Sequence, residues 1–220
     1  MARLARVTIP RLPHHITQRG NRRQPVFFCQ QDRQLYLRIL LEQSRKSGVA
    51  FWAYCLMDNH VHFIAVPERE ESLAKAFGET HRRYTSFINQ REGWTGYLWQ
   101  GRFASFPLDE AHVYAAIRYV ERNPVDAGLV ARAEEFPWTS ARAHVNGTPD
   151  PLLARHVVKE RVPDWADFLR SPQDEFKKQF ARHAWTGRPF GDPAFVGRLE
   201  QLTGRRLHKR RQEREGGKRN

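Results

Sequence analysis

The chain has 220 residues, of which 40% are hydrophobic, and this is enough for one domain with its own core and a small appendage. With 37 Lys and Arg against 24 Asp and Glu, the formal net charge is +13, and a field of that sign concentrates polyanions. Arginine dominates the basic residues, the arginines cluster, and aromatic residues are plentiful. We therefore expect a nucleic acid, rather than a membrane surface, as the partner.

Several classes of protein are excluded by what the sequence lacks. The two cysteines, Cys29 and Cys55, indicate neither a disulfide framework nor a cysteine zinc site. No apolar run reaches the roughly 18 residues that a membrane span needs, and the first residues lack the apolar core of a signal peptide. We expect a cytoplasmic protein without a membrane partner.

The first part of the chain alternates between strand and helix patterns. The expected elements are a strand at 14–19, a helix at about 30–47, a hairpin of strands at 49–57 and 60–66, a helix at about 72–91, a strand at 102–106, and a helix from Glu110 to about Arg122. Pro107 indicates an edge position or the end of the last strand, and Asp109 is typical of a helix N-cap. This order predicts an α+β fold, a ferredoxin-like split βαβ sandwich with an antiparallel central sheet and an extra helix.

The remainder of the chain is less regular. We expect a helix at 166–182 and a second one that starts after Asp192 and stops at Gly204. From Arg205 to Asn220, eight basic residues and two glutamates give 8 − 2 = +6, and without a hydrophobic pattern we expect disorder there. The predicted division is a main domain at 1–145, a helical extension at 146–204 and a basic tail at 205–220.

A His-x-His pair occupies the strand expected at 60–66. Residues two apart in a strand point to the same face, roughly 6.6 Å apart, so His60 and His62 can present two imidazoles to one metal ion. Alone, this short motif is a weak signal, and two polar residues at the mouth of a hairpin are the ordinary interpretation.

The helix from Glu110 carries two further candidates on one flank. Val113, Ala116, Ile117 and Val120 form its apolar stripe, and Tyr119 falls about 90° away from the middle of that stripe. Asn123 lies four residues on, on the same edge of the helix, and His112 shares that flank. By pattern alone, a half-buried tyrosine with a wet hydroxyl and a helix C-terminal asparagine are the favoured interpretations.

Two segments resemble a known group of enzymes. The segment 56–63, with His60-Val61-His62, resembles the metal-binding strand of the HUH endonuclease superfamily, named for histidine–hydrophobic–histidine. The segment 117–130 resembles the tyrosine segment of that superfamily's single-tyrosine transposases. The segments 98–103 and 136–140 also fit, and the most similar group is the REP-associated tyrosine transposases of bacteria, over roughly residues 10–145.

The resemblance implies a function for each matching residue. Tyr119 matches the catalytic nucleophile, and His60, His62 and Asn123 match the ligands of a divalent metal, Mg²⁺ or Mn²⁺. The implied protein is a transposase that cuts and rejoins single-stranded DNA next to hairpins through a 5′-phosphotyrosine intermediate. We expect a monomer, with a homodimer as the alternative, and we expect DNA contacts from six arginines: Arg19, Arg22, Arg23, Arg82, Arg83 and Arg102.

Two other functions stay open at the level of the sequence. A non-cleaving regulator derived from such a transposase would bind palindromes with the same fold and charge. An RNA-binding module with a ferredoxin-like sheet would carry aromatic residues in an RNP-like strand, and the strand with His60 and His62 lacks that motif.

Overall fold

The computed structural model describes residues 5–154, 162–171 and 174–208. Its first part consists of β1 (His14–Arg19), α1 (Gln30–Ser47), β2 (Val49–Met57), β3 (His60–Pro67), α2 (Ser72–Glu92), β4 (Ala104–Pro107) and α3 (Glu110–Asp126). The four strands form one sheet in the order β2-β3-β1-β4, and every neighbouring pair is antiparallel. This arrangement confirms the expected α+β fold with an antiparallel sheet. Pro107 lies on an edge strand, as expected.

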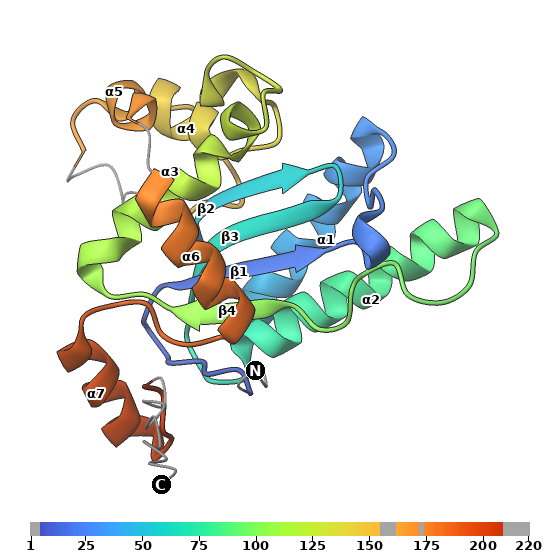
Figure 1. The fold of residues 1–220 in the computed structure, drawn as a ribbon. Coiled ribbons are helices and arrows are strands. Elements are labelled where there is room, and N and C mark those ends of the chain that lie inside the picture. Colours follow the sequence, from blue (N-terminus) through green and yellow to red (C-terminus); the bar gives the residue numbers. More distant parts are fainter. Residues whose placement is uncertain (1–4, 155–161, 172–173, 209–220) are drawn as a thin grey trace, which may run out of the picture.

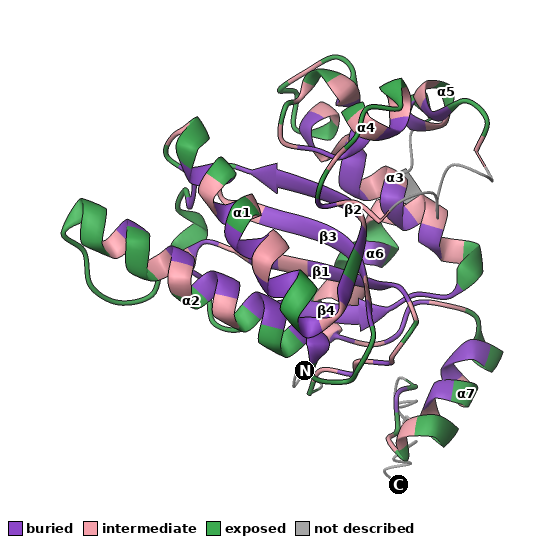
Figure 2. Cartoon of the chain, turned by 180° about the vertical axis from the view of Figure 1, so that it is seen from behind, coloured by how far each residue is buried: buried purple, intermediate pink, exposed green. Residues whose placement is uncertain are grey.

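Helices cover both faces of the sheet (Figure 1). The alternation along β3 sends Val61 and Phe63 into the core under α1 and α2, and Ile64 into a second core under α3 and α6 (Asp174–Thr186). Figure 2 shows the strands buried between these layers, while the outer faces of α1 and α2 are exposed. No helix in the described part of the chain has the length and apolar character that crossing a membrane requires.

Helix α3 is longer than the sequence indicates. Because a proline lacks an amide N–H and disfavours helix at the preceding residue, the sequence predicts a helix end near Arg122, yet the helix continues through Pro124 to Asp126. Pro124 is buried, and the side chain of Asn123 donates from Nδ2 to the carbonyl of Tyr119 at 2.9 Å. Packing and this side-chain hydrogen bond therefore outweigh the proline.

The helix expected at 166–182 is wrong, because two helices occupy this stretch. They are α5 (Trp165–Arg170) and α6, and between them Ser171 has an extended backbone with φ −68° and ψ 123°. Ser171 precedes Pro172 in the sequence, and a residue before proline is disfavoured in a helix. Two 3-10 turns, at Asn21–Arg23 and Ala133–Glu135, and helix α4 (Ala141–Asn146) were not anticipated.

The C-terminal helix α7 (Pro193–Thr203) agrees with the prediction. The Asp192 side chain accepts from the amide of Phe195, and Gly204 ends the helix with φ 63°. The expectation of disorder from Arg205 onward is wrong for the first residues, because Leu207 is buried against α7 and the N-terminal segment. Residues 209–220 of the expected tail lie outside the described residues, and the domain boundaries at 145 and 204 stay predictions.

A buried glutamate joins α3 to the segments that follow it. Glu121 is completely buried and accepts hydrogen bonds from Ser140 Oγ at 2.5 Å, His144 Nδ1 at 2.6 Å and Trp165 Nε1 at 2.7 Å. These contacts come from around α4 and from α5, so the carboxylate holds the extension against the helix that carries Tyr119.

Replacing Glu121 with Ala should lower the free energy of unfolding by at least about 3 kcal/mol, since three buried donors each lose an acceptor at about 1 kcal/mol or more. Urea denaturation followed by circular dichroism measures the change. Glu70→Ala, at an exposed carboxylate, is the control and should leave the unfolding midpoint unchanged. A Glu121→Ala protein as stable as the wild type would contradict this account.

Candidate functional site

The two predicted histidine ligands lie side by side on β3. His60 pairs across β1 with Arg19, and His62 pairs with Thr17, so both imidazoles occupy the face of the sheet that α3 covers. Their ring centroids are 5.0 Å apart. His60 Nδ1 hydrogen-bonds with the side-chain oxygen of Asn59 at 2.7 Å, and since that oxygen only accepts, Nδ1 carries the proton and Nε2 keeps a lone pair.

Helix α3 brings Tyr119 and Asn123 to the same place. The ring of Tyr119 lies edge-on to His62, with the centroids 5.6 Å apart. The Asn123 carboxamide lies close enough to His60 and to the Tyr119 hydroxyl to act on the pKa of both groups, and its Nδ2 donates to the Tyr119 carbonyl. The structure therefore brings together all four residues that the resemblance implies.

His15 on β1 also belongs to this cluster, and the sequence interpretation missed it. Its Nε2 lies 2.8 Å from His62 Nδ1, and the ring is completely buried. One signal in the sequence pointed to His15. The split βαβ order places its strand beside the strand of His60 and His62.

Helix α6 closes the cluster on one side. The ring of Phe180 lies 4.7 Å from Tyr119 and 4.5 Å from His15, centroid to centroid. The helical extension therefore contributes to the walls of the site. His112, seven residues and about 10 Å of helix rise before Tyr119, instead hydrogen-bonds with Asp109.

Burial determines the protonation of the cluster. It lowers the pKa of His60 to about 4 and that of His62 well below the usual value, and the positive charge of Arg19 acts in the same direction. Both rings are therefore neutral at pH 7 and offer lone pairs. Burial raises the pKa of the Tyr119 hydroxyl, while Arg19 opposes this shift.

The donor chemistry fits a divalent metal ion. Two neutral imidazoles and one carboxamide oxygen form a mixed nitrogen and oxygen set, which Mn²⁺ and Mg²⁺ accept. No group of three or more His, Cys, Asp or Glu side chains that could hold a metal occurs among the described residues. The third donor implied here is the amide of Asn123, which lies outside those four residue types.

A cleft of about 870 Å³ opens in front of His62 and Tyr119. Four of the six predicted DNA-binding arginines line it, namely Arg19, Arg22, Arg23 and Arg102. Arg22 and Arg23 have left-handed backbones, with φ 51° and 62°, which non-glycine residues adopt at a cost of about 1 kcal/mol or more. Trp185 of α6, 74% exposed, also lines the cleft and was not predicted.

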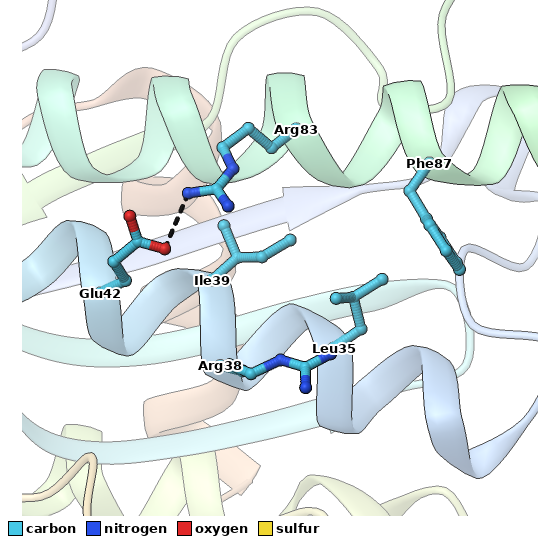
Figure 3. A pocket seen from close by; sticks show the side chains of 6 residues that line it. All are labelled: Leu35, Arg38, Ile39, Glu42, Arg83 and Phe87. Carbon is cyan, nitrogen blue, oxygen red and sulfur yellow. Dashed lines mark hydrogen bonds and ion pairs between the residues drawn. The ribbon is translucent and has the colours of Figure 1, made fainter.

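The other two predicted arginines lie elsewhere. Arg82 and Arg83 belong to α2, on the opposite face of the sheet from Tyr119, and they form ion pairs with Glu79 and Glu42. Figure 3 shows Arg83 reaching across a groove between α1 and α2 to Glu42, with 2.9 Å between Nη1 and Oε2. The structure does not bring these two arginines to the site, and their contact with DNA stays a prediction.

Comparisons with known proteins find a family model that matches and a solved structure of similar fold. Residues 8–123 match the family model described as "Transposase IS200 like". The structure of a REP-associated tyrosine transposase bound to a REP hairpin has 20% identity and a TM-score of 0.54, and the match covers 72% of this chain and 94% of that one. A candidate transposase from Deinococcus radiodurans R1 has 21% identity and a TM-score of 0.38, with coverage of 54% and 94%. No curated protein matches the chain.

Buried imidazoles should make the stability depend on pH. Burial lowers the pKa of His14 to about 4 and those of His15 and His81 to about 3, whereas the unfolded chain titrates near 6.5. As the pH falls from 6.5 towards 5, the unfolded chain binds protons that the folded protein does not. The free energy of unfolding should therefore fall, with a slope approaching about 1.4 kcal/mol per pH unit for each buried imidazole.

Urea denaturation between pH 7 and pH 5 measures this slope. His81 lies on α2, away from the site. His81→Gln should reduce the slope of the unfolding free energy against pH by the contribution of one imidazole, up to about 1.4 kcal/mol per pH unit. Equal stability at pH 7 and pH 5 would show that these rings are protonated in the folded protein.

Proposed function

Because this chain belongs to the IS200-like transposase family, we propose that it cuts and rejoins single-stranded DNA through a covalent bond to Tyr119. We propose that it does so beside hairpins, as the solved structure of a REP-associated tyrosine transposase with a REP hairpin suggests. The observation that carries the proposal is the convergence of His60, Asn123, His62 and Tyr119, of which the last two line a cleft together with four arginines.

The proposed reaction is a transfer of a phosphodiester bond. The Tyr119 oxygen attacks the phosphorus and loses its proton, the bond from phosphorus to the 3′ oxygen breaks, and that oxygen leaves as a 3′-hydroxyl. The product is a 5′-phosphotyrosine, and attack by another 3′-hydroxyl reverses the step and rejoins DNA without an external source of energy. Since burial raises the pKa of Tyr119, the hydroxyl needs help to lose its proton, and nearby Arg19 favours the anionic form.

The residues beside Tyr119 fit the role of metal ligands. His60 and His62 each present a neutral ring, and Asn123 contacts both His60 and the nucleophile. A Mg²⁺ or Mn²⁺ ion held there would polarise the scissile phosphate. We propose that a monomer carries the complete site, with a homodimer as the alternative.

The cleft fits a single strand of nucleic acid better than a duplex. Arginines that line a groove can follow a phosphate backbone, and Trp185 exposes a flat aromatic surface on which an unpaired base can stack. Paired bases in a duplex stack on one another and do not offer their faces in this way.

Tyr119→Phe should abolish the covalent adduct between the protein and DNA. Purified protein is mixed with Mn²⁺ and labelled hairpin oligonucleotides with single-stranded flanks, and a denaturing gel separates the adduct from free DNA. Tyr114→Phe is the matched control, because Tyr114 is a half-buried tyrosine of the same helix that lines a different pocket. Its adduct should equal that of the wild type.

Two outcomes of this assay would contradict the proposal. An adduct that persists in Tyr119→Phe would assign the nucleophile to another residue. Tight binding to a hairpin without an adduct from the wild-type protein would support the alternative, a non-cleaving regulator that binds palindromes.

Trp185→Ala should weaken the binding of a hairpin with a single-stranded flank by about 5- to 150-fold, because stacking of one base contributes about 1–3 kcal/mol. Binding to the hairpin without its flank should change little. Trp94→Ala is the control, since Trp94 is 48% exposed and does not line the cleft. Fluorescence anisotropy measures both affinities, and equal losses in the two variants would argue against a stacking site at Trp185.

A further inference from the structure

His15 is a buried histidine whose polar contact is directed at one predicted metal ligand. Its exposed fraction is 0%, and its Nε2 lies 2.8 Å from His62 Nδ1. Its other nitrogen, Nδ1, is buried without a hydrogen-bond partner among the described residues. A buried polar atom without a partner lowers the stability of the folded protein. A histidine at this position therefore indicates a role that an apolar side chain could not fill.

The surroundings hold the His15 ring in one orientation. Phe106 of β4 and Phe180 of α6 pack against it, with centroid distances of 5.1 and 4.5 Å. His15 and His62 are diagonal neighbours across the β1–β3 pair, because His62 lies opposite Thr17. The sheet and the aromatic rings together direct His15 Nε2 at His62 Nδ1.

The hydrogen bond couples the tautomers of the two rings. A hydrogen bond between two imidazole nitrogens 2.8 Å apart needs an N–H on one ring and a lone pair on the other. If His15 Nε2 accepts from the N–H at His62 Nδ1, then His62 Nε2 carries a lone pair. If the proton lies on His15 Nε2 instead, then His62 carries its own proton on Nε2 and cannot bind a metal through that nitrogen.

We propose that His15 is a positioning residue that accepts a hydrogen bond from His62 Nδ1 and so presents the Nε2 lone pair of His62 to the metal ion. The proposal rests on the proposed metal site. It also gives His62 the same arrangement as His60, whose Nδ1 donates to the Asn59 side chain. Each ring is then held through Nδ1, and both present Nε2. Such partners of metal-ligating histidines fix the tautomer and the ring orientation.

The test measures Mn²⁺ binding to the whole protein by the electron paramagnetic resonance signal of free Mn²⁺. His15→Leu removes the acceptor and should weaken Mn²⁺ binding about 10- to 100-fold. His15→Gln can place an amide oxygen near the former Nε2 and should restore binding to within about threefold of the wild type. His81→Leu is the control, because His81 is also a buried histidine with one side-chain partner, Tyr36, on the other side of the sheet. It should leave Mn²⁺ binding unchanged.

A second measurement separates positioning from simple packing. Nitrogen-15 NMR of the Mg²⁺-loaded protein should show His62 protonated at Nδ1 and not at Nε2. A proton on His62 Nε2, or wild-type Mn²⁺ affinity in folded His15→Leu, would overturn the inference. His62→Ala distinguishes the two levels of the account: if it too keeps wild-type Mn²⁺ affinity, the proposed metal site itself is wrong. If only His62→Ala loses the metal, the site stands and the role of His15 falls.

Discussion

Because side chains alternate between the faces of a strand, the antiparallel register of β1 and β3 decides which face of the sheet carries the imidazoles. With His62 opposite Thr17, three histidines, His15, His60 and His62, point towards α3, and Val61 and Phe63 fill the core on the other side. A slip of β3 by one residue would turn His60 and His62 to the face now occupied by Val61 and Phe63. Burying imidazole rings in the apolar core under α1 and α2 would be unfavourable, and this constraint fixes the register that assembles the site.

The C-terminal extension supplies part of the wall of the candidate site. Phe180 of α6 packs on Tyr119 and His15, and Trp185 lies on the wall of the cleft. Glu121 on the buried side of α3 joins this helix to α4 and α5. The same helix thus presents Tyr119 to the cleft and anchors the extension, so changes in the extension should reach Tyr119 through packing.

The sequence predicted most of the first part of the fold, because β-strand alternation and helical periodicity are local signals that persist in the structure. The four candidate site residues, His60, His62, Tyr119 and Asn123, lie together in the structure, while their roles come from the resemblance and stay predictions. The predicted helix boundaries were wrong at two places. At Pro124, packing overrides the tendency of proline to end a helix, and at Ser171 the helix is interrupted because a proline follows in the sequence. His15 and Trp185 were missed because their importance depends on neighbours far away in the chain.

The identity of the residue that becomes bonded to DNA tests the central claim most directly. A hairpin substrate with a single-stranded flank, in which sulfur replaces the leaving 3′ oxygen, would trap the covalent intermediate, and peptide mass spectrometry would locate the nucleotide. The account predicts a 5′-phosphate linked to Tyr119, in a peptide that also contains Asn123 or adjoins it. A nucleotide on any other residue would contradict the account.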